Sequence, residues 1–342
     1  MTMLFQRGRR NLFLMLVAFA ALSWPHTANA QPKAEPTAKD KYIEELSVET
    51  PDNILLFYNY YKVKPKPDAK EPKPVNEAPV VLIIAHDKGN KQDYDALARE
   101  LQAAGCAVIV PDLRGVGKSN KRLLKDVVGG QVVVGKTVPV TATRPADFVA
   151  MVEIDLEKIK TEMVKLHNAG EFNIRRLCVI GVESGSVLAL NWTLLKDWTW
   201  PDLTTGPQAK DVRGLVLISP RWNHKGLIIN KAIEQGEFIK FIPTLIMVGV
   251  KDNNYANDAK RLYDQFDRYL PLPANATDME RMELQKLFDF KFDTTLEGFK
   301  LLNERKLTLP SDPKKVPYDP VVIIKYFIDS RVSNNEFKWI ER

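Results

Sequence analysis

Short, continuous apolar stretches rich in β-branched residues recur along the chain, separated by segments whose apolar positions have helical spacing. Such stretches are typical of strands buried on both faces of a parallel sheet. Strands of this kind are predicted over 80–85, 106–110, 175–181, 212–218, 243–250 and 288–296. Helices are predicted over 93–104, 146–168, 184–198, 228–236, 257–270 and 317–332. This alternation predicts one doubly wound α/β domain, with a mostly parallel sheet and helices on both faces.

Three segments stand outside the alternation. Residues 42–63 hold two strand-like stretches joined by a turn at 51–53. Residues 64–79 are rich in proline and lysine, which predicts an extended, exposed connector. That connector is either an elaborated surface loop or a docking segment for an anionic surface or a partner. Residues 121–145 are predicted to form an inserted loop or a small hairpin.

The first thirty residues have the pattern of a secretory signal peptide. Arg7, Arg9 and Arg10 form a basic region, an apolar stretch follows over 12–22, and Ala28-Asn29-Ala30 fits the small-x-small cleavage rule. Cleavage near Ala30 would leave a flexible lead at 31–41 and a single domain at 42–342, exported to the periplasm or secreted. An uncleaved anchor is the alternative, and the paired arginines also fit a twin-arginine signal. Once the segment is cleaved, no membrane span is expected.

Composition narrows the possible functions. The net charge of +6 falls by three, to +3, when the signal segment is removed. This mild excess of positive charge gives no reason to expect nucleic-acid binding. Cys106 and Cys178 each lie in an apolar strand-like stretch, which favours two buried thiols. Export also permits a disulfide between them. No metal site and no cofactor motif are predicted.

Residues 177–190, LCVIGVESGSVLAL, read as a strand, a tight turn and a helix. Gly181 and Gly185 flank the turn in the spacing of G-x-S-x-G, the nucleophile elbow that presents a hydrolase serine above a parallel sheet. The central position of this motif is occupied by Glu183 instead of serine.

Four motifs in this order resemble the α/β-hydrolase superfamily. VVLIIAHDKG resembles the strand that leads into the oxyanion loop, here His86, Asp87 and Lys88, and CAVIVPDLRGVGKS resembles the segment after the next strand. LCVIGVESG resembles the elbow, and PTLIMVGVKD resembles the strand that delivers the acid of the catalytic triad, here Asp252. The resemblance covers about 42–332 and extends, more weakly, to exported bacterial hydrolase-like proteins. It implies an α/β-hydrolase fold and an ester or acyl hydrolase activity.

The catalytic machinery that the resemblance implies is incomplete. The family order is nucleophile, acid and then histidine, yet none of the four histidines follows Asp252. The segment Thr295-Leu296-Glu297-Gly298-Phe299-Lys300 stands where the family has its histidine. Asp87 replaces the glycine of the oxyanion loop, and a carboxylate there would oppose the negative charge that develops during acyl transfer.

Several roles remain open for the residues at the elbow. Ser184 would be the nucleophile in a register shifted by one residue, but Val182 fits poorly beside a tight turn. Glu183 would act either as a carboxylate nucleophile or as a helix-terminus carboxylate that plugs the anion site and blocks the pocket. A carboxylate nucleophile needs a histidine to activate water, and His224 is the one remote candidate. Asp252 would serve as the acid, cap the next helix or pair with a lysine.

Three tryptophans are predicted on loops at the carboxyl edge of the sheet, where ligands bind in open α/β folds. Trp198, Trp200 and Trp222 would either stack on a ligand, with His224 nearby, or pack a cap over the fold. The leading hypothesis is an exported α/β-hydrolase-fold protein with an incomplete triad, which binds an unknown small molecule or protein. The alternative is an ester or acyl hydrolase with a non-standard site formed by Glu183, Ser184, His224 and Asp252.

Overall fold

The computed structural model describes residues 40–64, 74–128, 131–201, 208–273, 275–333 and 337–342. The predicted signal peptide and most of the lead and the proline- and lysine-rich connector lie outside these residues. None of the described helices combines the length and the apolar content that a membrane-spanning helix needs.

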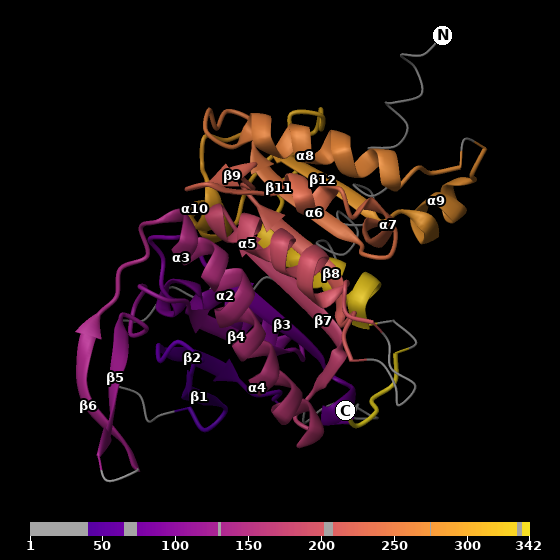
Figure 1. The fold of residues 1–342 in the computed structure, drawn as a ribbon. Helices are drawn as coiled ribbons and strands as arrows, with labels where there is room; N and C mark the ends of the chain where they lie inside the picture. Colours follow the sequence, from indigo (N-terminus) through magenta and orange to yellow (C-terminus); the bar gives the residue numbers. More distant parts are fainter. Residues whose placement is uncertain (1–39, 65–73, 129–130, 202–207, 274, 334–336) are drawn as a thin grey trace.

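An eight-stranded sheet forms the centre of the molecule (Figure 1). Its strands, in spatial order, are β1 (Ile43–Glu49), β2 (Leu55–Tyr61), β4 (Ala107–Asp112), β3 (Pro79–Ile84), β7 (Asn173–Val182), β8 (Val212–Ile218), β11 (Thr244–Gly249) and β12 (Leu287–Phe292). β1 and β2 are antiparallel to their neighbours in this sheet. The other six strands of the sheet, β4, β3, β7, β8, β11 and β12, are parallel to one another. This confirms the predicted doubly wound, mostly parallel sheet.

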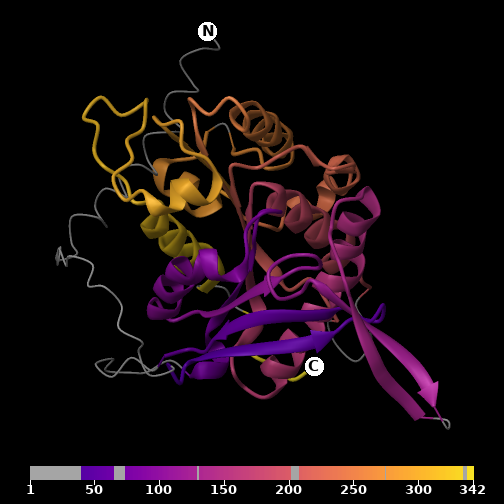
Figure 2. The same ribbon diagram turned by 90° about the vertical axis from the view of Figure 1, so that its left-hand side faces the viewer.

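Burial explains why the central strands read as continuous apolar stretches. Every residue of β3, β4 and β11 is buried, because helices cover both faces of the sheet (Figure 2). One apolar core contains residues of α4, α5 and α8, and the other contains residues of α2, α10 and α11. A strand with a helix layer on each face has no solvated side on which polar residues would be favoured.

The helices follow the predicted spacing, with added local detail. Their bounds are α2 (Asp95–Ala103), α3 (Pro145–Ala150), α4 (Leu156–Asn168), α5 (Ser184–Trp192), α6 (Asn230–Ile233), α7 (Gly236–Ile239), α8 (Ala256–Tyr269), α9 (Asp278–Leu284), α10 (Gly298–Asn303) and α11 (Pro320–Ile328). A 3₁₀ turn precedes α2, and π-helical turns follow α3, α5 and α11. The helix predicted over 228–236 is divided into α6 and α7, and α9 and α10 were not predicted.

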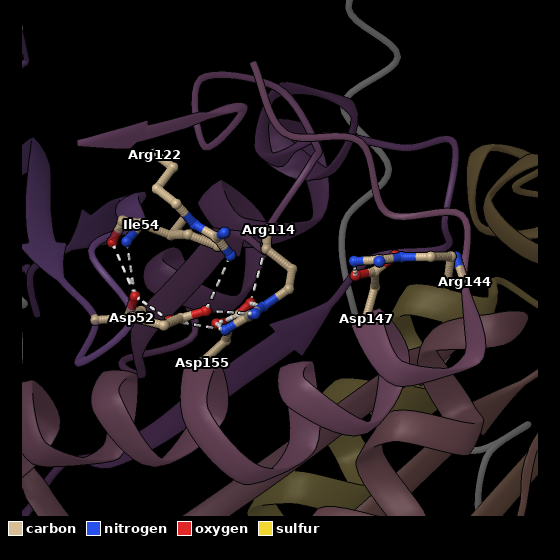
Figure 3. Close-up of polar contacts among 8 residues, drawn as sticks. Asp52, Ile54, Arg114, Arg122, Arg144, Asp147 and Asp155 are labelled. Carbon is tan, nitrogen blue, oxygen red and sulfur yellow. Dashed lines mark hydrogen bonds and ion pairs between the residues drawn. The ribbon is translucent and has the colours of Figure 1, made fainter. Parts of the chain in front are cut away.

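The inserted segment forms a β-hairpin that projects from the body (Figures 1 and 2). Its strands, β5 (Lys121–Val128) and β6 (Gln131–Pro139), pair with each other as a separate two-stranded sheet. Charged contacts fix its base to the β1–β2 turn (Figure 3). Arg122 pairs with Asp52 at 3.5 Å, and the buried Arg114 donates hydrogen bonds to both Asp52 and Asp155.

The two cysteines are both buried thiols outside any disulfide, as the favoured interpretation predicted. Burial raises the pKa of the Cys178 thiol well above its ordinary value. Both residues pack in the core on the side of the sheet that α2 and α11 cover. The disulfide that export would permit is therefore absent.

Candidate functional site

The elbow is formed by the end of β7 and the start of α5. Glu183 lies at its apex with φ of 52° and ψ of −116°, a left-handed conformation that is unusual for a residue with a side chain. A Cβ at Gly181 would lie 2.7 Å from the Cα of Ser186, and one at Gly185 would lie 2.3 Å from the carbonyl oxygen of Ile84. Both flanking positions therefore require glycine, and Glu183 rather than Ser184 holds the central position.

The side chain of Glu183 points toward the loops that follow β11 and β12. The hydroxyl of Tyr255 donates a hydrogen bond of 2.9 Å to Glu183 Oε2, and Arg221 donates to the same hydroxyl oxygen at 2.9 Å. Glu183 Oε1 lies against Gly298, where a Cβ would be only 1.7 Å away. The prediction that this carboxylate would cap the free N–H groups of α5 is wrong, because Glu183 makes no side-chain capping bond to the helix.

Ser184 contacts the oxyanion loop. Its buried Oγ accepts a hydrogen bond of 2.8 Å from the backbone N–H of Asp87. In a hydrolase elbow, an N–H group of this loop would stabilise the oxyanion of the reaction. In this chain the Asp87 N–H already has a hydrogen-bond acceptor.

The carboxylate of Asp87 binds a small hairpin formed by β9 (Asn223–His224) and β10 (Leu227–Ile228). Asp87 Oδ2 lies 3.3 Å from His224 Nε2 and 3.0 Å from Lys225 Nζ. These two side chains, His224 first, hold the pKa of Asp87 below its usual range. The Asp87 carboxylate is thus paired with the hairpin, a contact that the sequence analysis did not predict.

The other two residues of this loop have different surroundings. His86 Nδ1 lies 2.9 Å from the hydroxyl of Tyr94, and the imidazole stacks on Phe299 at a centroid distance of 6.2 Å. Lys88 is exposed to solvent. Among the described residues, no hydrogen bond or ion pair joins the side chains of this loop to the Glu183 carboxylate.

Asp252 follows β11, as predicted for the acid of a triad. Its Oδ1 accepts hydrogen bonds from the backbone N–H groups of Asn254 and Tyr255, at 2.8 and 3.3 Å, so the side chain stabilises the loop that leads into α8. Its Oδ2 is buried and has no hydrogen-bond partner among the described residues. Burial, assisted by the nearby charges of Glu297 and Glu183, raises the pKa of Asp252.

His224 does not join the residues of the proposed alternative site. Its ring packs edge-on against Phe148 at 4.8 Å, and Nε2 faces Asp87. Within the described part of the chain, no hydrogen bond connects His224 to Ser184, Glu183 or Asp252. The four residues therefore do not form a hydrogen-bonded relay.

Trp198 and Trp222 pack against the protein, whereas Trp200 is 48% exposed. Trp222 is buried, donates its indole N–H to Asn230 at 2.8 Å, and has the guanidinium of Arg261 3.5 Å from its ring centroid. Trp198 lies at the amino edge of the sheet, where its indole N–H donates to the carbonyl oxygen of Val212. Its predicted place at the carboxyl edge, shared with Trp200, is wrong, because a loop that leads from a helix into a parallel strand meets the amino end of that strand.

Little space remains at the elbow. A hollow of about 20 Å³ beside Ser184 is lined by residues that include His86, Asp87, Phe148 and Leu188, and this volume holds roughly one water molecule. A larger groove, of about 190 Å³, runs along β12 and contains no elbow residue. Across the described ranges, no three His, Cys, Asp or Glu side chains come together as metal ligands.

Comparison with solved structures identifies the architecture. The esterase Est22 is similar with a TM-score of 0.50 and 15% identity, over 84% of this chain and 81% of that one. A mutant of the same esterase gives a TM-score of 0.51 and 15% identity, over 84% and 80%. This chain has the α/β-hydrolase fold. A scan against protein-family models and a search of curated proteins find no match.

Within an α/β-hydrolase fold, sequence reasoning placed the elbow and the acid but missed the partners of Glu183. Tyr255, Arg221 and Gly298 surround the elbow carboxylate. Gly298 lies in the segment 295–300, which the sequence analysis singled out, and this was the one sequence feature that pointed to any of the three. Tyr255 and Arg221 belong to no motif, so the fold was needed to find them.

Proposed function

We propose that this protein is an exported α/β-hydrolase-fold protein that binds or scaffolds rather than catalyses. The observation that carries the proposal is the Glu183 carboxylate at the elbow, held by Tyr255 and seated against Gly298. A carboxylate at this position replaces the hydroxyl that would attack an ester. The side chain also fills the space next to the apex.

The surrounding groups support the same conclusion. A serine hydroxyl needs a base within hydrogen-bond reach to act as a nucleophile near neutral pH. Ser184 Oγ accepts from a backbone N–H, and His224 and His86 have Asp87 and Tyr94 as neighbours. A carboxylate nucleophile would likewise need an imidazole to activate the water that breaks the ester intermediate.

A binding role requires a surface outside the closed elbow. The connector at 64–79 is our candidate segment for a protein partner, because its proline and lysine content favours an extended and accessible chain. Export follows from the signal-peptide pattern at 1–30. A variant that lacks residues 65–73 should keep its melting temperature and lose partners that crosslink to the intact exported protein. An unchanged set of crosslinked partners would count against the connector.

The test of the non-catalytic proposal uses the processed protein beginning at Gln31. We expect no labelling by a fluorophosphonate probe and no hydrolysis of p-nitrophenyl esters with short acyl chains above the rate in buffer. The matched variants are Ser184→Ala and Glu183→Gln, which remove the two oxygens that would attack. The proposal would be overturned, and the alternative hydrolase favoured, if the unaltered protein hydrolysed these esters and either substitution abolished that hydrolysis.

A further inference from the structure

Residues 337–342, FKWIER, contact the amino ends of β3, β7 and β8, at the opposite end of the sheet from the elbow. In Figure 1 the end of the chain lies beside the end of α4. These six residues belong to no helix or strand. Phe337, Trp339 and Arg342 are partly buried, and the other three are exposed. The segment therefore lies on the surface of the body with one side turned inward.

Side chains of the body bind the main chain of this segment. The carbonyl oxygen of Phe337 accepts hydrogen bonds from Arg176 Nε and Asn173 Nδ2, at 2.9 and 3.0 Å. The N–H of Trp339 donates to Glu77 Oε1 at 3.1 Å. In peptide recognition, main-chain hydrogen bonds supply affinity and pockets for individual side chains supply specificity. The first of these two elements is present in the contact.

Two residues at the end of α4 extend these main-chain contacts. Asn168 Oδ1 accepts the N–H of Arg342 at 3.0 Å, and Asn168 Nδ2 donates to the carbonyl oxygen of the same residue. A primary amide can form both bonds because it carries a donor and an acceptor side by side. His167 Nε2 lies 2.8 Å from the carbonyl oxygen of Ile340. The segment is thus held through its backbone along most of its length.

The aromatic side chains of the segment have their own contacts, which supply specificity. The ring centre of Phe337 lies 3.7 Å from the guanidinium carbon of Arg213. Trp339 tilts against the ring of His167 at a centroid distance of 5.3 Å and donates its indole N–H to the carbonyl oxygen of that histidine at 3.0 Å. A cation over an aromatic face favours aromatic over aliphatic side chains, so these positions select Phe and Trp.

Arg342 completes a buried group of charges. Its guanidinium pairs with Asp211, which is 2% exposed and also lies 3.1 Å from Lys160 Nζ. Lys160 pairs in addition with the buried Asp197. Two carboxylates thus face two cations, and this group would carry a net negative charge without Arg342. Removal of one partner from a buried ion pair is strongly unfavourable, so the contact selects a cation at this position.

We propose that this face is a peptide-binding groove for the pattern Phe-x-Trp-x-x-Arg. Residues 337–342 occupy the groove in this structure, and the same pattern presented by a partner protein replaces them. This site is separate from the connector at 64–79 and from the elbow. Ester hydrolysis at the elbow would therefore overturn the proposed function and leave the groove untouched.

The first measurement asks whether the segment leaves the groove while the rest of the protein stays folded. In the protein that begins at Gln31, hydrogen exchange should protect the amides of Trp339 and Arg342 at least about 100-fold less than the amide of Leu82 in β3, because a segment outside the sheet opens locally. Asp211→Asn should lower the protection of the segment more than that of Leu82. Equal protection of the segment and Leu82 would show that the segment leaves only on global unfolding, and would overturn the proposal.

The second measurement presents the pattern on a separate molecule. The chain carries Phe337→Ala and Arg342→Ala, which weaken its own occupant, and the probe is a fluorescein-labelled peptide of sequence NNEFKWIER. We expect saturable binding by fluorescence anisotropy. The unaltered chain should bind at least about 100-fold more weakly, because its tethered segment competes at an effective concentration of millimolar order. A variant that melts cooperatively and does not bind the probe would refute the groove, and the exchange experiment decides the question if the variant does not fold.

Matched probes test the chemistry of the pattern. Glutamine in place of the peptide's arginine should weaken binding roughly 30-fold or more, because Asp211 is left without its partner. Glutamine in place of the preceding glutamate, which is exposed at position 341, should leave binding unchanged. Addition of Asp211→Asn to the protein should remove most of the difference between the arginine and glutamine probes. Equal affinities for these two probes in the presence of Asp211 would contradict the assignment of the arginine position.

Discussion

At the residue scale, a short relay of hydrogen bonds compensates the charge of Glu183. Burial, first among its causes, raises the pKa of Tyr255 to about 12, so its hydroxyl stays protonated and donates to the carboxylate. Arg221 donates to the same hydroxyl and lies with its guanidinium 4.5 Å from the centre of the tyrosine ring. A partly buried carboxylate such as Glu183 is tolerated when hydrogen bonds and a nearby positive charge stabilise it. The elbow carboxylate is therefore a well-supported feature of this fold.

Asp252 has hydrogen-bond donors at Oδ1 but, among the described residues, none at Oδ2, which gives a prediction for its neutral analogue. Asp252→Asn should stabilise the protein by about 0.5–1 kcal/mol at pH 7, because the amide oxygen still accepts from the loop while the charge is lost. The raised pKa of Asp252 means that the folded state binds this proton more tightly than the unfolded state does. The gain should therefore shrink as the pH falls through the pKa of the folded state.

Urea unfolding between pH 7 and pH 4 measures both effects. The control is Asp264→Asn, which changes an exposed residue paired with Lys260 and should alter stability by less than about 0.5 kcal/mol. A variant that is less stable than the natural protein at pH 7 would show that the Asp252 charge is favourable.

At the element scale, the β9–β10 hairpin is fixed over the elbow by Asp87. His224 and Lys225 both approach its carboxylate, and Lys225 also lies 5.0 Å from the ring centre of Phe148, which lines the hollow beside Ser184. The Asp87 side chain thus has a structural role, because it connects its own loop to the β9–β10 hairpin.

The hairpin contact gives a second prediction. Asp87→Asn should destabilise the protein by about 1 kcal/mol at pH 7, the scale of a partly exposed ion pair. Because the pKa of Asp87 is lowered by folding, this contribution is present above the unfolded value near 4 and is lost as the pH falls toward the folded value. Denaturant unfolding of both proteins at pH 7 and pH 3 should show a difference that decreases at pH 3. A difference that grows on acidification would refute the assignment.

At the scale of the whole molecule, both cysteines lie in the core of the fold. The two thiols are buried on one side of the sheet and separated from solvent, so an oxidising compartment would leave them reduced. The sheet, its two helix layers and the elbow are built from residues after position 42.

Processing gives the third prediction. Mass spectrometry of the exported fraction should find a chain that begins at Gln31, because signal peptidase requires small residues at positions 28 and 30. Ala30→Lys should prevent cleavage and leave the precursor with the membrane fraction. Arg9→Lys with Arg10→Lys should stop export only if the segment is a twin-arginine signal. Intact chains that begin at Met1 in the soluble exported fraction would contradict the prediction.

The sequence by itself determined the sheet, the helix layers and the elbow. The continuous apolar stretches identify strands buried on both faces, and Gly181 and Gly185 identify a turn too tight for any Cβ. These signals are local in the chain, so they can be read without knowledge of the fold.

Only the tertiary structure decided where the elbow side chains point. Glu183 turns from its own helix toward Tyr255 and Gly298, and Asp87 turns toward His224. Each of these contacts joins segments that are far apart in the sequence. The direction of the side chain depends on the backbone conformation at its position and on the course of the loops around it, and no local sequence pattern determines either. The same reason explains why Trp198 was assigned to the wrong edge of the sheet and why the hollow at Ser184 could not be measured from sequence.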